Sequence, residues 1–104
     1  MAGVGAVIVA AGKGTRMGAE VSKQYLEIGG KPILAYTLEA FERAALIEEV
    51  VLVVGAAELG LGEVLRERYG LRKLAQIVPG GGERQHSVYQ GLLHATADWV
   101  LVHD

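Results

Sequence analysis

The sequence predicts an α/β fold that is doubly wound, with a mainly parallel sheet. Short apolar runs rich in valine recur along the chain, as expected of strands that are covered on both faces. The segments between these runs carry apolar residues at helical spacing. Strands that alternate with helices in this way form right-handed βαβ units and therefore a parallel sheet.

The expected elements follow one another without a linker that would divide the chain. Pro32 suits the first turn of a helix, and Gly70 suits the end of one. We expect strands at 4–10, 49–55, 75–78 and 99–102, helices at 32–44, 58–69 and 83–96, and a short extended arm at 24–28 before Gly29 and Gly30. Apolar faces should form the core, and we expect the following aromatic residues to be buried in it: Tyr25, Tyr36, Phe41 and Trp99.

Composition and charge limit the possible functions. The 104 residues are 51% hydrophobic, which indicates a packed core in one domain or in a piece of one. The formal net charge of −2 provides no basic field for nucleic acid, so we expect no nucleic-acid partner. Cysteine is absent, and neither a signal segment nor an apolar run of membrane-spanning length is present. We therefore expect a cytoplasmic protein without a membrane partner.

A glycine-rich loop follows the first expected strand. Residues 10–18 read Ala-Ala-Gly-Lys-Gly-Thr-Arg-Met-Gly, and Lys23 comes shortly afterwards. Gly12 and Gly14 allow the backbone to approach a ligand closely, and N–H groups in such a turn can surround a polyphosphate together with nearby cations. The alternative is a turn whose glycines serve geometry alone and whose cations are solvated.

Two common phosphate-binding motifs do not fit this loop. The dinucleotide fingerprint G-x-G-x-x-G would need glycine at Met17. The P-loop pattern would need glycine at Val7 and serine or threonine at Gly14. The loop instead resembles the G-x-G-x-R-M-G signature of nucleotidyltransferases, which take a nucleoside triphosphate and release pyrophosphate.

Two further stretches follow the ends of expected strands. Three glycines at 80–82 come after the third strand and Pro79, and Asp104 comes after the fourth strand. Ligands of open α/β sheets bind outside the carboxyl ends of the strands. We therefore expect the loop at 10–18, the glycines at 80–82 and Asp104 to converge on one site.

Three stretches make the resemblance narrower. Together they closely resemble the 2-C-methyl-D-erythritol 4-phosphate cytidylyltransferase family: Lys23-Gln24-Tyr25-Leu26, Gly81-Gly82-Glu83-Arg84-Gln85-His86-Ser87-Val88 with Gly91-Leu92, and Val100-Leu101-Val102-His103-Asp104. The resemblance implies a Rossmann-like sheet of the nucleotidyltransferase type. Because the family is considerably longer, it also implies that residues 1–104 are a truncated, N-terminal part of a single nucleotide-binding domain. Ser22 and His86 depart from the usual proline and aspartate of the family.

The resemblance implies transfer of CMP from CTP to methylerythritol phosphate with release of pyrophosphate. Arg16 and Lys23 match the two cations of the family that stabilise the transition state. The alternatives without a catalytic role are that Arg16 pairs with Glu20 on the surface and that Lys23 is a solvated loop lysine. Asp104 matches the carboxylate of the family that helps to hold Mg²⁺ against the triphosphate, a ligand type that Mg²⁺ accepts alongside phosphate oxygens.

The resemblance also implies a set of CTP-binding residues. Ser87 is the ambiguous member, because a serine near a helix start caps the helix as readily as it binds a pyrimidine edge. Arg84 either meets a phosphate or, as we prefer, plays a structural role. The implied CTP-binding residues are Ala10, Ala11, Gly12, Lys13, Gly14, Gly81, Gly82 and Ser87.

Two other functions stay open at this point. Pentitol-phosphate cytidylyltransferases resemble the same motifs, because the residues that bind the acceptor lie downstream of Asp104 in the family. A CTP-binding fragment without turnover is the other alternative. The partners that the resemblance implies are CTP, a small sugar-alcohol phosphate and, in the complete protein, a second copy in a homodimer.

Overall fold

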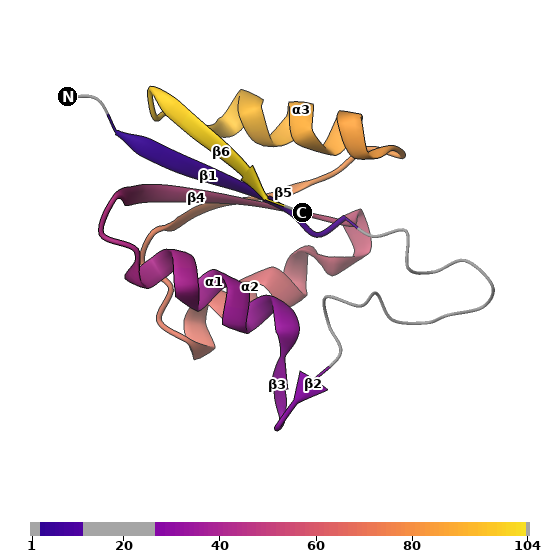
Figure 1. Ribbon diagram of the computed structural model, residues 1–104. Helices are drawn as coiled ribbons and strands as arrows, with labels where there is room; N and C mark the ends of the chain where they lie inside the picture. The colour runs from indigo at the N-terminus through magenta and orange to yellow at the C-terminus, as the bar shows by residue number, and fades with distance from the viewer. Residues whose placement is uncertain (1–2, 12–26, 104) are drawn as a thin grey trace.

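A parallel sheet forms the centre of the computed structural model, which describes residues 3–11 and 27–103. Its strands within these ranges lie side by side in the order β5-β4-β1-β6, and every neighbouring pair is parallel (Figure 1). The chain therefore runs outward from β1 to one edge and then returns to pair on the other side of β1. The strands are β1 (Val4–Val9), β4 (Ile47–Val54), β5 (Leu74–Pro79) and β6 (Trp99–His103).

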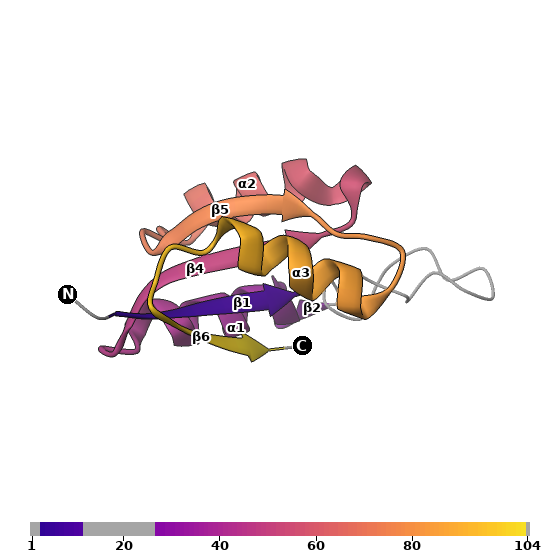
Figure 2. The same ribbon diagram turned by 90° about the horizontal axis from the view of Figure 1, so that it is seen from above.

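Helices cover both faces of this sheet, as the doubly wound prediction requires. Figures 1 and 2 show α1 (Ile33–Arg43) and α2 (Leu59–Arg68) on one face and α3 (Arg84–His94) on the other. A short 3-10 turn, η3 (Ala56–Glu58), precedes α2. The main strands and helices match those expected from the sequence, with ends that differ by two residues at most.

Alternation along β1 and β4 divides the core between the two faces. Ala6, Ile8 and Leu52 are buried against α1 and α2, whereas Val7 and Val53 are buried on the side of α3. Helix α3 approaches the sheet closely at Gly91, where an added Cβ would lie 2.3 Å from a methyl carbon of Val7. A glycine is therefore needed at this point of contact.

The segment before α1 is a tight hairpin. Strand β2 (Glu27–Ile28) pairs antiparallel with β3 (Lys31–Pro32). Gly29 and Gly30 connect the strands with φ of 64° and 82°. Positive φ at both central residues is characteristic of a type I′ turn and explains the two glycines. Pro32 then serves as the N-cap residue of α1.

Helix α2 ends as the sequence predicts, at a glycine. Gly70 has φ of 60°, and the N–H of Leu71 donates to the carbonyl of Arg66 at 3.0 Å. This bond is the long one of a Schellman motif, which turns the chain toward β5.

Glu49 of β4 holds the turn that leads into β6. Its Oε1 accepts hydrogen bonds from the backbone N–H groups of Thr96 at 2.8 Å and Ala97 at 2.7 Å, and Oε2 accepts one from the Thr96 hydroxyl at 3.1 Å. The Glu49 side chain passes Gly5 of β1, where an added Cβ would lie 3.2 Å from Oε1. We call these contacts the Glu49 clasp. It ties β6 to its neighbours at the amino end of the sheet.

The expectation that the aromatic side chains are buried is partly wrong. Phe41 is half-buried, but Tyr36 is 44% exposed and Trp99 is 67% exposed. Trp99 stands on the edge strand β6, and Tyr36 points from α1 toward the hairpin. Tyr25 lies outside the described residues.

Candidate nucleotide-binding site

The loops that follow β1 and β5 both begin beside the carboxyl end of β4, which lies between these two strands. The N–H of Ala10 donates to the carbonyl of Val53 at 2.7 Å, and the N–H of Gly80 donates to the carbonyl of Val54 at 2.8 Å. Each loop therefore continues the ladder of its strand by one residue before it turns away. These two bonds bring the first residues of both loops to one place at the edge of the sheet.

Among the described residues, Gly80 lies close to Ala11, the last described residue of the β1 loop. A Cβ added to Gly80 would lie 2.4 Å from Ser87 Oγ and 2.7 Å from the Cβ of Ala11. Both distances are too short for a real side chain, so only glycine fits here. For the residues that the structure describes, the predicted convergence of the β1 loop and the glycines at 80–82 is confirmed. Gly80 was not in the predicted set of binding residues, although the run of three glycines pointed to it.

Ser87 links helix α3 to the glycine loop. Its Oγ accepts a hydrogen bond from the N–H of Gly81 at 3.2 Å, and the residue is only 1% exposed. The N-cap residue of α3 is Glu83, which makes no side-chain capping bond. The capping interpretation of Ser87 is therefore wrong. Its hydroxyl closes the loop instead, and its contact with a base stays a prediction.

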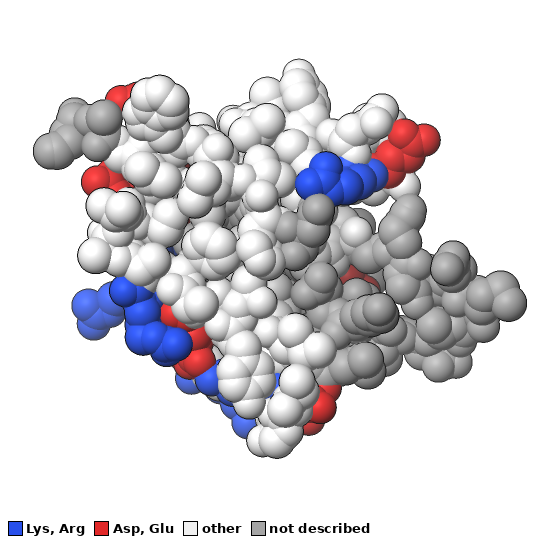
Figure 3. Space-filling view, in the orientation of Figure 1, with Lys and Arg blue, Asp and Glu red and all other residues white. Residues whose placement is uncertain are grey.

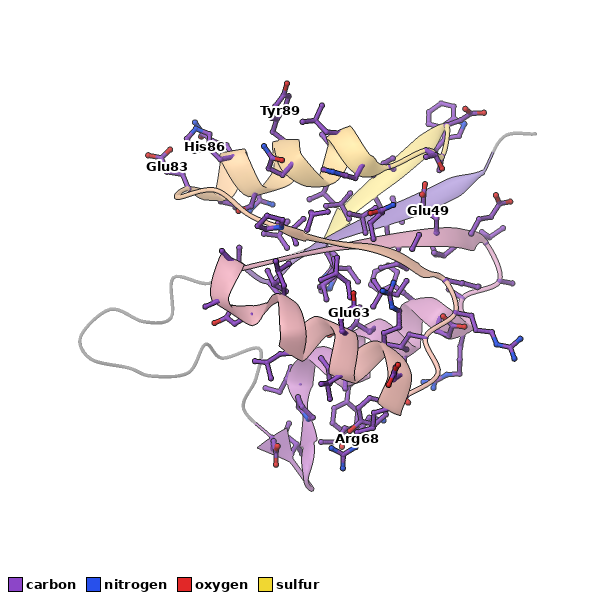
Figure 4. The ribbon with its side chains drawn as sticks, turned by 180° about the vertical axis from the view of Figure 1, so that it is seen from behind. Glu49, Glu63, Arg68, Glu83, His86 and Tyr89 are labelled. Atoms are coloured by element: carbon purple, nitrogen blue, oxygen red, sulfur yellow. The ribbon has the colours of Figure 1, made fainter. Side chains whose placement is uncertain are left out.

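Gly81 and Gly82 present their backbone to solvent. Both are exposed, and nothing lies within 4 Å of the position that a Cβ on Gly82 would take. His86 covers one side of Gly81, since a Cβ there would lie 2.3 Å from the Cβ of His86. Figure 4 shows Glu83 and His86 at the end of α3 nearest this loop, with Tyr89 farther along the helix. The positive end of the α3 dipole thus lies at the site and favours an anion there.

The end of β6 lies beside the end of β1. His103 pairs with Ile8 in the parallel ladder, and its ring meets that of Phe41 edge to face at a centroid distance of 5.5 Å. The described end of β6 therefore lies next to the end of β1. Asp104, which follows His103 in the sequence, lies outside the described residues.

The structure describes part of the predicted site. It brings Ala10, Ala11, Gly81 and Ser87 together around Gly80, and Gly82 extends the same loop. Among residues 3–11 and 27–103, no group of three His, Asp or Glu side chains could hold a metal ion. The other predicted residues lie outside the described ranges: Gly12, Lys13, Gly14, Arg16, Lys23 and Asp104.

The site offers a ligand backbone N–H donors, the amino end of α3 and an edge of the sheet that is lined by glycines. The site lies at the carboxyl ends of β1, β4 and β5, next to the β1–β6 pair at which the strand order reverses, and doubly wound sheets bind ligands at this edge. Fold and site define a Rossmann-like domain of the nucleotidyltransferase type. Comparison with known proteins narrows this class to one family. The family model for 2-C-methyl-D-erythritol 4-phosphate cytidylyltransferase, IspD, matches residues 4–104. The chain therefore belongs to that family.

Individual relatives agree with this assignment. The 2-C-methyl-D-erythritol 4-phosphate cytidylyltransferase of Pelotomaculum thermopropionicum is 48% identical over an alignment of length 104 that covers 97% of this chain and 44% of the relative. The protein of the same name from Geobacter metallireducens is 50% identical over an alignment of length 105 that covers 95% of this chain and 45% of the relative. The crystal structure of 4-diphosphocytidyl-2C-methyl-D-erythritol synthase from Anaerococcus prevotii superposes with a TM-score of 0.79 at 30% identity and covers 99% of this chain and 43% of the other.

The chain therefore spans less than half the length of the relatives it matches. In the part that the structure describes, no helix is long and apolar enough to cross a membrane.

Proposed function

We propose that this chain supplies the CTP-binding part of a cytidylyltransferase that acts on 2-C-methyl-D-erythritol 4-phosphate. The observation that carries the proposal is the packing of Ala11, Gly80 and Ser87, which joins the two loops that the family resemblance assigns to CTP. The acceptor is inferred from the names of the relatives. Residues 1–104 would form the N-terminal part of a single domain, in a cytoplasmic homodimer.

The proposed reaction is an in-line displacement at phosphorus. A phosphate oxygen of methylerythritol phosphate forms a bond to the α-phosphorus of CTP, and the bond from that phosphorus to the β-phosphate bridging oxygen breaks to release pyrophosphate. Such reactions depend on positioning and on preorganised positive charge. Backbone groups of the β1 loop and of Gly81 and Gly82 would hold the nucleotide, while Arg16 and Lys23 would stabilise the charge that develops on the α-phosphoryl oxygens.

We propose that the site holds a magnesium ion together with CTP. The resemblance assigns this role to Asp104, which follows His103 in the sequence, and His103 lies opposite Ile8 near the end of β1. One carboxylate together with phosphate oxygens is a donor set that Mg²⁺ prefers. When bound, the ion would neutralise part of the triphosphate charge, and Asp104 would hold it.

A CTP-binding module without turnover is the second candidate. The observation that favours it is that the packing of Ala11, Gly80 and Ser87 joins loops assigned to CTP, whereas the resemblance assigns no described residue to the acceptor. Pentitol phosphates are the alternative acceptors, since the motifs described above resemble those of both groups of cytidylyltransferases.

The test is pyrophosphate release by the longest gene product that contains this chain. We expect release with Mg²⁺, CTP and methylerythritol phosphate, and none with ribitol 5-phosphate as acceptor or with UTP and a sugar 1-phosphate. Arg16→Ala and Lys23→Ala should each lower kcat about 100-fold or more, the typical cost of a lost transition-state contact. Arg43→Ala is the matched control, because Arg43 is exposed at the far end of α1. CTP binding without release from any pair would favour the silent module.

A further inference from the structure

The hairpin β2–β3 holds one end of the segment that carries Arg16 and Lys23. Glu27, its first residue, is four positions after Lys23 in the sequence. The hairpin register is fixed by the I′ turn, with Glu27 opposite Pro32 and Ile28 opposite Lys31. Pro32 leads at once into α1, so the hairpin moves only if its contacts with the helices are broken.

Lys31 makes most of those contacts. Its Nζ lies 4.6 Å from the ring centroid of Tyr36 and 5.0 Å from that of Tyr69, and it forms an ion pair with Glu39. The side chains of Lys31 and Glu39 are 24% and 22% exposed, so this pair is largely shielded from water. The single ammonium group therefore connects β3 to α1 and to the end of α2. We call these contacts the Lys31 cage.

The other strand of the hairpin, β2, is bound to the same cage. Tyr36 Oη donates a hydrogen bond to the carbonyl of Ile28 at 2.8 Å. Tyr36 therefore binds Ile28 through its hydroxyl and Lys31 through its ring. A hairpin with two residues in each strand is not stable by itself. The position of the hairpin therefore depends on these contacts, and Lys31 supplies their positive charge.

We propose that Lys31 is a positioning residue for nucleotidyl transfer. Its cage fixes the hairpin β2–β3, which follows Arg16 and Lys23 in the sequence. This inference rests on the proposed function. Lys31 itself need not touch either substrate. Its removal should leave CTP able to bind through the glycine loops but should reduce the fraction of complexes in which the cations are aligned.

The test compares Lys31→Met with Arg68→Met in the longest gene product that contains this chain. Arg68 is the matched control, because its guanidinium carbon also lies over the Tyr69 ring, 5.9 Å from the centroid, but it points outward from α2 and does not join the hairpin (Figure 4). The readouts are amide hydrogen exchange of residues 27–32, and kcat and KM for CTP measured by pyrophosphate release.

For Lys31→Met we expect exchange in 27–32 to quicken about 10-fold and kcat to fall by about 10-fold to 100-fold, a typical cost of misplaced catalytic groups. KM for CTP should change much less. Lys31→Arg should restore most of kcat, since a guanidinium keeps the charge and stacks on aromatic rings. Arg68→Met should leave both readouts unchanged. If Lys31→Met does not fold, Tyr36→Phe, which removes only the bond to Ile28, takes its place with a smaller expected loss of kcat.

Unchanged kcat together with faster exchange would overturn the inference, and so would unchanged exchange. A rise in KM for CTP as large as the fall in kcat would also overturn it, because it would indicate general damage to the site. Absence of pyrophosphate release by the unaltered protein would instead overturn the proposed function, and this inference with it.

Discussion

The hydroxyl of Ser87 accepts a hydrogen bond from the backbone N–H of Gly81 at 3.2 Å, from a position on α3 that is 1% exposed. The bond joins the first turns of a helix to the loop that precedes it. The glycine loop therefore takes its shape from α3, and α3 is in turn packed against β1 and β4 at Gly91.

Replacing Ser87 by alanine should loosen the glycine loop. The N–H of Gly81 loses its acceptor, at a cost of about 1 kcal/mol in the free energy of unfolding. If the loop holds CTP, a similar cost should weaken CTP binding by about 5-fold. Urea unfolding and titration calorimetry with CTP measure the two effects. Tyr89→Phe is the control, since it removes an exposed hydroxyl from the same helix. Equal effects from both variants would contradict the special role of Ser87.

Gly80→Ala should be more damaging to the fold. The new methyl group would collide with Ser87 Oγ and with the Cβ of Ala11, so the two loops would have to separate. Overpacking of this kind typically costs about 1 to 3 kcal/mol of stability. Gly82→Ala tests the explanation, because its Cβ would meet nothing within 4 Å and stability should stay as it was. A stable Gly80→Ala protein would show that the loops are not packed as described.

Glu49→Ala should destabilise the sheet from its amino end. The variant leaves the N–H groups of Thr96 and Ala97 without their carboxylate acceptor, and hydrogen bonds to charged groups are worth about 2 kcal/mol. The free energy of unfolding should fall by about that amount, as measured in urea. Glu48→Ala removes the exposed neighbouring carboxylate and should have little effect. If the two variants lose equal stability, the clasp does not act as inferred.

The 104-residue chain should self-associate when it is prepared by itself. Strand β6 forms an edge of the sheet, and Trp99 and Leu101 on it are 67% and 53% exposed. Figure 3 shows the largely uncharged surface of this side of the molecule. Apolar edge strands of this kind pair with other chains.

Sedimentation should therefore show species larger than the 11.0 kDa monomer. The double substitution Trp99→Lys and Leu101→Lys should shift the chain toward monomer. Leu46→Lys should not, because Leu46, although 79% exposed, lies outside the edge strand. Cooperative unfolding of a monomeric, unaltered chain would contradict the prediction.

Local patterns in the sequence predicted most of the fold. Valine runs and helical spacing located each main strand and helix, and Gly29, Gly30 and Gly70 marked turns whose positive φ the structure confirms. The convergence of the loops followed from a general property of parallel sheets, namely that strand ends of one polarity share an edge. For this reason the convergence of the loops that follow β1 and β5 could be expected without any contact being known.

Contacts between distant segments could not be predicted in the same way. Glu49 bonds with residues 96–97, and Lys31 meets Tyr69, yet nothing in the local sequence of either residue indicates its partner. The lateral position of β6 explains a further error. A strand with apolar residues on both faces predicts burial, but Trp99 on this edge strand is exposed. The bond of Ser87 with Gly81 was not among the roles that its position near a helix start suggested.

The central place of β1 also has a consequence for the order in which the protein folds. Among the strands that the structure describes, β1 is synthesised before its two partners, and it pairs with β4 on one side and with β6 on the other. Its two partners are synthesised at very different times, so one of its edges stays open until almost the whole of this sequence has emerged. Pairings between segments so far apart are slow to form. During synthesis, an unpaired apolar strand is bound by chaperones or else aggregates with other chains. Translation of the segment between β1 and β6 should thus be the stage most sensitive to loss of chaperones.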